Sequence, residues 1–217
     1  MYEHKEFPKV FIINHPLVQH KLSMMRMKEC IQQDFKSALH EISLLMGYEL
    51  TRWLPLGEQT IETPIQKMNA PVIEGKRPAI VPILRAGLGM SEGLQALMPS
   101  SPVGHIGLYR DHETHKPVEY LVKLPDVKDR HFILVDPMLA TGNSAAYAVD
   151  VLVKNGVDKD NISFMALLGA PEGITTFRQQ YPDLPIYIAA LDEKLDDNAY
   201  IIPGLGDAGD RLFGTAA

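Results

Sequence analysis

The sequence contains very little cysteine, and none of its apolar runs is long. Cys30 is the only cysteine among 217 residues, so no disulfide can form within the chain, and a reducing compartment such as the cytoplasm is expected. The first ten residues, MYEHKEFPKV, mix charges throughout and lack the apolar core of a secretion signal. No stretch approaches the roughly 18 consecutive apolar residues that span a bilayer. We therefore expect a cytoplasmic protein without a membrane segment.

The chain also lacks an excess of positive charge. Lysine and arginine total 21 against 27 aspartates and glutamates, which gives a net charge of -6, and no run of basic residues stands out. Proteins that bind DNA or RNA through its phosphates are normally basic on at least one face. We therefore expect no nucleic-acid partner.

What the sequence does contain is ordinary globular composition, with 46% hydrophobic and 22% charged residues. A length of 217 residues suits one domain, which we expect to span residues 1–217. From Pro78 onward, short apolar runs alternate with helical stretches. The expected strands are 79–84, 103–108, 131–135, 162–168 and 186–191. The expected helices are one that follows a turn at 85–87 and runs to about residue 97, one at 144–154 and one near 173–180, with an earlier amphipathic helix at 22–46.

This alternation predicts an α/β fold with a mostly parallel sheet flanked by helices, because nearly all-apolar strands must be covered on both faces. In such sheets ligands bind at the carboxyl ends of the strands. The loops after Leu84, Leu108, Val135 and Leu191 are therefore the expected site. The methionines within 22–46 are expected to fill the core or a subunit contact.

The most informative segment follows the strand at 131–135, where Asp136 precedes Leu-Ala-Thr-Gly-Asn-Ser and then a helix. The unsatisfied amides at a helix start lie at the positive end of its dipole and attract phosphate. Gly142 allows close approach, and the Thr141 and Ser144 hydroxyls add donors. A Thr-Gly pair alone would favour an ordinary turn in which Ser144 caps the helix.

The C-terminal segment Tyr200–Arg211 packs three glycines and a proline into seven residues, which predicts a tightly folded loop rather than a helix or strand. Taken alone it could be a surface turn with two solvated acids. Its apolar Ile201, Ile202 and Leu205 alternate with the glycines and instead favour a buried, shaped wall.

These two segments together resemble the uracil phosphoribosyltransferase family, in the strings VDPMLATGNSA and YIIPGLGDAGDR. The resemblance runs from about residue 15 to residue 215. It implies a phosphoribosyltransferase-type fold with a C-terminal base-binding hood loop and a flexible arm at Asp111–Pro125, whose histidines are expected to be solvated loop residues.

The resemblance also implies site residues. Those expected to bind 5-phosphoribosyl 1-diphosphate are Arg85, Arg110, Asp136, Pro137, Met138, Leu139, Ala140, Thr141, Gly142, Asn143, Ser144 and Asp207. Those expected to contact uracil are Ile201, Gly206, Asp207 and Ala208.

Arg85 and Arg110 each follow an expected strand, in the strings ILRAGLGM and GLYRDHE. Either alone would be a surface arginine with a salt-bridge partner. In the family the matching arginines hold the diphosphate. Negative charge builds up on the diphosphate as it leaves, and a guanidinium group can stabilise this charge with two hydrogen bonds. The resemblance therefore implies Asp207 and Arg110 as catalytic residues, with Asp207 reaching a metal through water.

The implied reaction joins uracil to 5-phospho-α-D-ribose 1-diphosphate and gives UMP and diphosphate, with Mg²⁺ as cofactor. A homodimer or homotetramer is expected, and control by an allosteric nucleotide such as GTP is left open. Two alternatives remain: a non-catalytic relative that senses nucleotides as a regulator, and a phosphoribosyltransferase for another base. The latter would keep the Asp136–Ser144 loop but change the wall at 201–208.

Four positions depart from the family pattern. Asn143 and Ala199 each stand where glycine is usual, Asp196 stands where asparagine is usual, and Met27 stands where a polar or acidic residue is common. Asn adopts a positive φ more readily than most residues, so we expect Asn143 to take up that conformation and preserve the loop.

Overall fold

The structure, a computed structural model, describes residues 1–110 and 117–215. Its centre is a mostly parallel sheet with the strand order β1-β2-β11-β10-β8-β5-β6-β7. The strands are β1 (Tyr2–Glu3), β2 (Val10–Ile12), β5 (Ala79–Leu84), β6 (His105–Arg110), β7 (Pro117–Lys123), β8 (Phe132–Val135), β10 (Ile162–Gly169) and β11 (Ile186–Leu191), and the short β9 (Met138–Leu139) pairs with β10. Only the outermost pairs, β1·β2 and β6·β7, are antiparallel among the described strands of this sheet.

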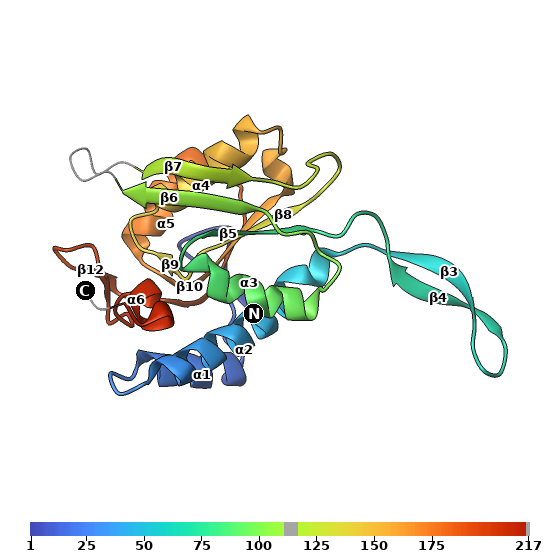
Figure 1. Ribbon diagram of the computed structural model, residues 1–217, viewed down its shortest axis with the longest axis horizontal. Coiled ribbons are helices and arrows are strands. Elements are labelled where there is room, and N and C mark those ends of the chain that lie inside the picture. Colours follow the sequence, from blue (N-terminus) through green and yellow to red (C-terminus); the bar gives the residue numbers. More distant parts are fainter. Residues whose placement is uncertain (111–116, 216–217) are drawn as a thin grey trace.

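Helices cover both faces of the sheet, as the sequence predicts (Figure 1). On one face lie α1 (Pro16–Arg26), α2 (Gln32–Leu50) and α3 (Gly87–Leu97), and on the other lie α4 (Asn143–Lys154) and α5 (Pro171–Gln180). The central strands are apolar throughout: all eight residues of β10 and all four of β8 are buried. Two hydrophobic clusters, one on each face, hold these layers together.

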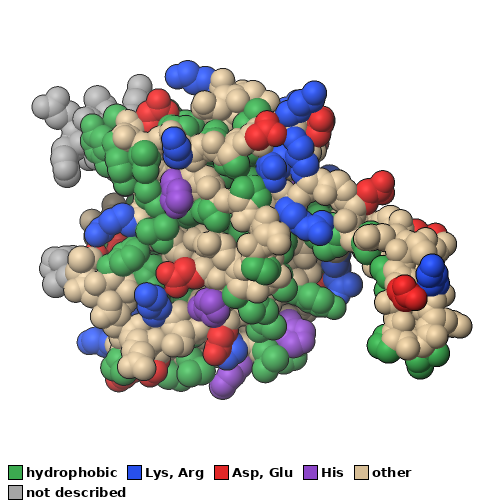
Figure 2. Space-filling model, turned by 45° about the vertical axis from the view of Figure 1, so that its right-hand side comes forward, with side chains coloured by type: hydrophobic (Ala, Val, Ile, Leu, Met, Phe, Trp, Pro, Cys, Tyr) green, Lys and Arg blue, Asp and Glu red, His purple; other side chains and the backbone are tan. Residues whose placement is uncertain are grey.

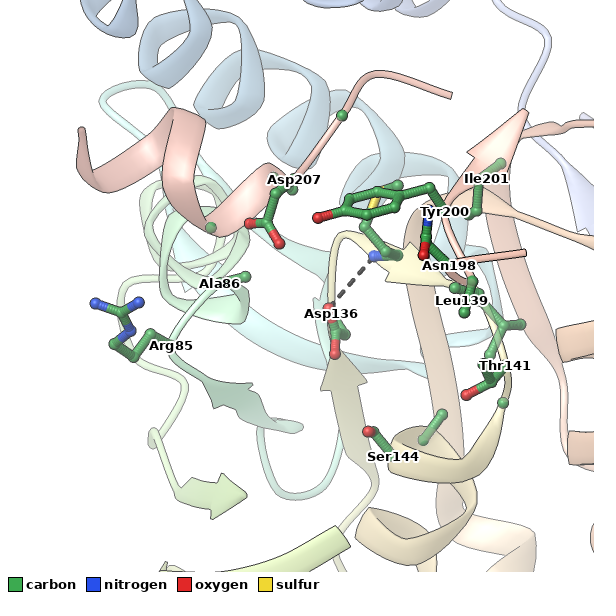
Figure 3. Close-up of a pocket in the computed structure, with 18 residues that line it drawn as sticks. Arg85, Ala86, Asp136, Leu139, Thr141, Ser144, Asn198, Tyr200, Ile201 and Asp207 are labelled. Atoms are coloured by element: carbon green, nitrogen blue, oxygen red, sulfur yellow. Dashed lines mark hydrogen bonds between the residues drawn. The ribbon is translucent and has the colours of Figure 1, made fainter. Parts of the chain in front are cut away.

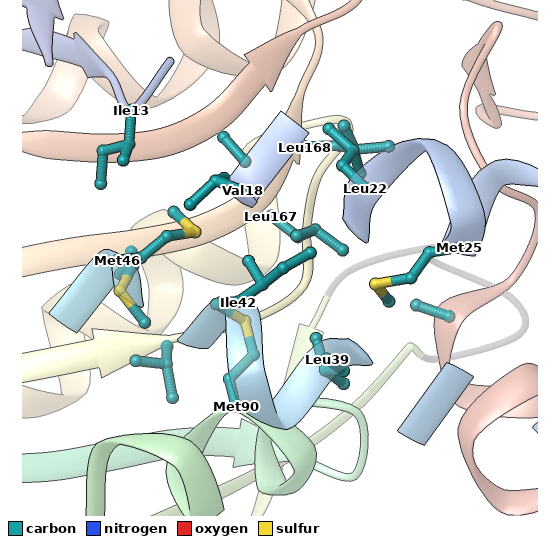
Figure 4. Packing of buried hydrophobic residues seen from close by; sticks show 14 of the residues in the cluster. Ile13, Val18, Leu22, Met25, Leu39, Ile42, Met46, Met90, Leu167 and Leu168 are labelled. Atoms are coloured by element: carbon teal, nitrogen blue, oxygen red, sulfur yellow. The ribbon is translucent and has the colours of Figure 1, made fainter. Parts of the chain in front are cut away.

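The expected helix at 22–46 is two helices, so that prediction is wrong in its bounds. Pro16 starts α1, with His15 as its cap, and the chain leaves the helix at Met27 before α2 begins at Gln32. The carbonyls of Met27 and Cys30 in this break accept hydrogen bonds from Arg211, far along the chain. Met25 and Met46 do lie in the core, as Figure 4 shows, whereas Met24 and Met27 are exposed.

A long hairpin is the largest feature that the sequence did not reveal. Strands β3 (Leu56–Glu62) and β4 (Lys67–Ile73) pair in antiparallel register and follow a short 3₁₀ turn, η1 (Thr51–Trp53). Figures 1 and 2 show the hairpin extending away from the rest of the molecule. Most of its residues are exposed on both faces, so its sequence lacks the alternation by which a half-buried strand is recognised.

Two further segments differ from expectation. Within the arm expected at Asp111–Pro125, the residues of β7 form an edge strand paired with β6, and residues 111–116, with His112 and His115, lie outside the described residues. The C-terminal loop contains regular structure: β13 (Ile201–Ile202) pairs with β12 (Lys194–Leu195), and α6 runs from Ala208 to Phe213. Asp207 is the N-cap of α6, and its carboxylate accepts the Asp210 N–H. The neighbouring glycines made this helix start difficult to recognise in the sequence.

None of the helices in the described ranges combines the length and apolar character needed to cross a bilayer.

His131 links the base of the hairpin to the sheet. Its ring lies 4.2 Å from that of Trp53, and its Nε2 is 2.8 Å from Ser163 Oγ. Burial lowers the pKa of His131 to about 4, so the ring is neutral in the folded protein at pH 7.

We expect acidification from pH 7 to pH 5 to cost the folded protein about 1–2 kcal/mol through His131 alone, because the unfolded state gains its proton near pH 6.5 while the folded state does not. The variant His131→Gln should lose that much less stability over this interval in urea unfolding. His20→Gln, at an exposed position, is the matched control and should behave like the parent. Equal losses for His131→Gln and the parent would contradict the assignment.

Candidate active site

A cavity of about 450 Å³ opens at the carboxyl ends of the central strands. Three stretches of the chain that are distant in sequence build it: the start of the loop after β5, the loop after β8 with the first turn of α4, and the C-terminal segment (Figure 3). Its lining residues are Arg85, Ala86, Asp136, Met138, Leu139, Ala140, Thr141, Gly142, Ser144, Ala145, Asn198, Ala199, Tyr200, Ile201, Gly206, Asp207, Ala208 and Gly209.

The loop after β8 is held in shape by backbone hydrogen bonds to β10. The carbonyl of Pro137 accepts from the amides of Leu167 and Leu168, each at 3.0 Å. Gly142 then has a φ of 81° and serves as the N-cap of α4 without a side-chain hydrogen bond to the first turn. The helix therefore presents its first amides towards the cavity without a capping side chain in front of them.

This loop also packs directly on the start of α5. A Cβ built on Gly142 would collide with the carbonyl of Gly173, and a Cβ on Gly173 would collide with the carbonyl of Ala140. The two glycines thus allow two backbones to touch. Gly142 combines this close approach with its positive φ, a combination that only glycine accommodates without strain.

Asp136 stands at the end of β8 with its carboxyl group in the cavity, where Oδ1 accepts from Met138 N–H at 3.3 Å (Figure 3). It keeps part of its surface accessible to the cavity. Burial nevertheless raises the pKa of Asp136 to about 7; the Met138 hydrogen bond opposes the rise, and the Asp207 carboxylate adds to it. A cation or a hydrogen-bond donor would therefore be stabilised between these two acids.

The loop after β5 contributes Arg85 and Ala86. The peptide bond between Leu84 and Arg85 is cis. Arg85 is exposed, and its guanidinium lies 5.5 Å from the ring centre of Phe213 in α6. This side chain therefore sits between the sheet and the C-terminal helix, at the rim of the cavity.

The C-terminal segment forms the opposite wall. Asp207 is exposed at the start of α6, and Figure 3 shows its carboxylate and that of Asp136 directed into the same space. The preceding turn is organised by Asp196, whose Oδ1 accepts from the amides of Asn198 at 2.9 Å and Tyr200 at 2.8 Å. Ala199 in this turn has a φ of 64°.

Most residues expected from the sequence line this cavity, with three exceptions. Pro137 is buried behind it, where its carbonyl holds the loop. Asn143 is exposed and does not line it; Gly142 takes the positive φ and Asn143 begins α4, so the expected conformation of Asn143 is wrong. Arg110 ends β6, and its side chain lies outside the described residues.

Six lining residues were not among the expected site residues, and most of them flank one that was. They are Ala86, Ala145, Asn198, Ala199, Tyr200 and Gly209. Tyr200 is the most informative, because its large ring lies across the cavity in Figure 3 between Asp207 and Leu139. Its ring is half-exposed, and a large aromatic residue at the start of a glycine-rich segment is the sequence signal that could have identified it.

Comparison with known families agrees with this arrangement. The family model described as uracil phosphoribosyltransferase matches residues 12–215. The chain belongs to the uracil phosphoribosyltransferase family. A uracil phosphoribosyltransferase of Rhodospirillum centenum is 63% identical over 215 residues, covering 99% of this chain and 100% of the relative. One from Burkholderia pseudomallei is 58% identical, covering 99% of both chains.

Solved structures confirm the fold expected of this family. The AQ2163 protein from Aquifex aeolicus is 32% identical and superposes with a TM-score of 0.89, covering 96% of this chain and 99% of its own. The APRTase from Giardia lamblia, solved with 9-deazaadenine, is 16% identical with a TM-score of 0.51, and covers 74% of this chain and 84% of its own. The latter likeness concerns the fold alone.

Ala199→Gly should stabilise this family member, because the left-handed conformation costs an alanine about 1–2 kcal/mol and costs glycine almost nothing. After the greater chain entropy of unfolded glycine is subtracted, a gain of roughly 0.5–1 kcal/mol in the free energy of unfolding is expected. Urea denaturation measures it. The control Ala96→Gly, at an exposed position in α3, should instead lower stability. A destabilised Ala199→Gly would show that the turn does not strain the alanine.

Proposed function

We propose that the chain is a pyrimidine-salvage enzyme, which transfers the 5-phosphoribosyl group of 5-phospho-α-D-ribose 1-diphosphate to uracil and releases UMP and diphosphate. The observation that carries this proposal is a single cavity that joins the uncapped start of α4 to the glycine-rich wall at Gly206–Ala208. The family membership and the full-length relatives support the same reaction.

The 5-phosphate of the substrate fits the start of α4. Gly142, at positive φ, turns the chain so that the first helical amides face the cavity, and the Thr141 and Ser144 side chains lie beside them. These groups offer a dianion several donors and the positive end of a helix dipole. Met138, Leu139 and Ala140 complete the loop, and Pro137 anchors it from behind.

The diphosphate fits the space between Arg85, Asp136 and Asp207. Arg85 at the rim can neutralise charge as the bond from C1 to the diphosphate breaks, and we assign Arg110 the same role from its place at the end of β6. The donor set also suits Mg²⁺, since two carboxyl groups face one space, where burial and, to a smaller extent, the Asp207 carboxylate raise the pKa of Asp136. When bound, Mg²⁺ would supply charge neutralisation at the diphosphate oxygens, with Asp207 contacting it directly or through water.

The base fits the wall formed by Ile201 and Gly206–Ala208. Ile201 is buried and supplies an apolar surface, while the backbone of the glycine-rich turn offers fixed amides and carbonyls. An amide that donates to O4 of uracil would face the amino group of cytosine donor to donor, and an unpaired buried donor costs about 1–3 kcal/mol. Uracil should therefore be preferred.

Assembly with further copies of the chain fits the projecting hairpin. It exposes several large apolar side chains to solvent, with 93% of Ile65 and 66% of Leu56 accessible. Apolar side chains concentrated on an extension are typical of protein–protein contacts. A homodimer or homotetramer, as the family resemblance implies, would cover them. The cytoplasm as location and an allosteric nucleotide such as GTP remain predictions of the sequence.

Purified protein supplied with Mg²⁺ and 5-phosphoribosyl 1-diphosphate should form UMP from uracil and at least about 100-fold less CMP from cytosine, because the polar wall leaves cytosine unpaired. Chromatographic separation of the nucleotides measures both. Equal rates would favour a phosphoribosyltransferase of broader specificity. Binding of nucleotides without turnover of any base would favour the non-catalytic regulator.

A further inference from the structure

The wall proposed to read the base has little regular structure of its own. Between β13 and α6 the chain runs through five residues, 203–207, in which Gly204 has a φ of 61° and Gly206 a φ of 80°. A Cβ on Gly204 would collide with the carbonyl of Ile201, so the turn is also tightly folded. Such a segment can hold its amides at fixed angles only if groups outside it fix its backbone.

An ion pair between the half-buried Arg26 and the buried Asp192 provides this support at Gly204. Asp192, which follows β11, accepts the Gly204 N–H at 2.9 Å, and Arg26, the last residue of α1, donates to the Gly204 carbonyl at 2.7 Å. The guanidinium of Arg26 also forks onto the carboxylate of Asp192 at 2.7 and 2.5 Å. Both polar backbone groups of one glycine are thus held by one pair of opposite charges.

A second arginine fixes the next residue. Arg211 donates to the Leu205 carbonyl at 2.8 Å and stacks on Phe35, with its guanidinium carbon 4.6 Å from the ring centre. The same guanidinium donates to the carbonyls of Met25 and Met27, on either side of Arg26. Two guanidinium groups therefore join the end of α1 to the wall: that of Arg26 bonds to the Gly204 carbonyl, and that of Arg211 bonds to the next carbonyl, of Leu205.

Neither Arg26 nor Asp192 lines the cavity, and the side chain of Asp192 is only 4% exposed. We propose that Arg26 and Asp192 are positioning residues for the base: they fix the backbone of Gly204 and thereby aim the amides at Gly206–Ala208. The inference rests on the proposed function. According to this inference, the affinity for the base depends on an ion pair outside the cavity. The phosphate loop after β8 does not depend on this ion pair, because it packs on β10 and α5.

The kinetic signature follows from this separation. In Asp192→Asn, Oδ1 can still accept the Gly204 N–H, but the charge that orients Arg26 is lost. In Arg26→Lys, one ammonium group cannot reproduce the fork and the bond to Gly204 together. We expect KM for uracil to rise about 10-fold in each variant, whereas KM for 5-phosphoribosyl 1-diphosphate changes less than about 2-fold.

The experiment is steady-state kinetics on the full chain with each substrate varied in turn. Arg52→Lys, which alters the exposed Arg52–Glu49 pair, is the matched control and should leave both KM values unchanged. Thermal denaturation of each variant establishes that it is folded, and Asp192→Asn, the nearly isosteric change, carries the test if Arg26→Lys does not fold. Discrimination against cytosine should weaken in parallel with the rise in KM for uracil.

Parallel changes in both KM values, or a loss of kcat alone with both KM values unchanged, would show that the ion pair only stabilises the fold and would overturn the inference. An inactive parent protein is a different result, since it would overturn the proposed function and the inference with it.

Discussion

Buried backbone amides and carbonyls need hydrogen-bond partners, and this constraint shapes the whole site. The cavity lies where the chain leaves its strands, so its loops cannot satisfy their backbone groups within regular structure. In the loop after β8, the Pro137 carbonyl accepts hydrogen bonds from the amides of Leu167 and Leu168 in β10. In the C-terminal wall, the carbonyls of Gly204 and Leu205 accept hydrogen bonds from Arg26 and Arg211, and the Gly204 N–H donates to Asp192. Each solution makes a loop rigid without placing a side chain in the cavity.

The same constraint explains how charge is distributed. The chain carries a net charge of -6, so positive side chains are in the minority. Nevertheless, the guanidinium groups of Arg26 and Arg211 donate hydrogen bonds to backbone carbonyls behind the wall and do not line the cavity. In front of the wall, Asp136 and Asp207 share one space, and the raised pKa of Asp136 reflects burial together with that neighbour. The cavity thus combines an amide-rich start of α4, suited to an anion, with an acidic pair suited to a cation or a donor.

An element of the fold or the site could be predicted from the sequence where residues close together in the chain determine its structure, and not where distant residues do. The strands at 79–84 and 186–191 match β5 and β11 in the structure, because fully buried strands are apolar without interruption. The loop Asp136–Ser144 was recognisable because its residues are consecutive in sequence and form a string that resembles the family. In the break of the expected helix at 22–46, the carbonyls of Met27 and Cys30 accept hydrogen bonds from Arg211, far along the chain. The hairpin β3–β4 is exposed on both faces. Neither leaves a local pattern.

Even inside the recognised loop the conformation was misassigned by one residue: Gly142 adopts the positive φ expected of Asn143, which frees Asn143 to begin α4. At Ala199, by contrast, a position where glycine is usual in the family does take a positive φ, with alanine in place.

The central claim is that one cavity receives the phosphate at the start of α4 and the pyrimidine at the C-terminal wall. A crystal structure of the protein with UMP tests it most directly. We predict that the 5′-phosphate lies against the backbone of Thr141–Ser144 and that the uracil ring contacts Ile201 and Gly206–Ala208. A nucleotide bound elsewhere, or one whose base lies at the start of α4, would contradict the account.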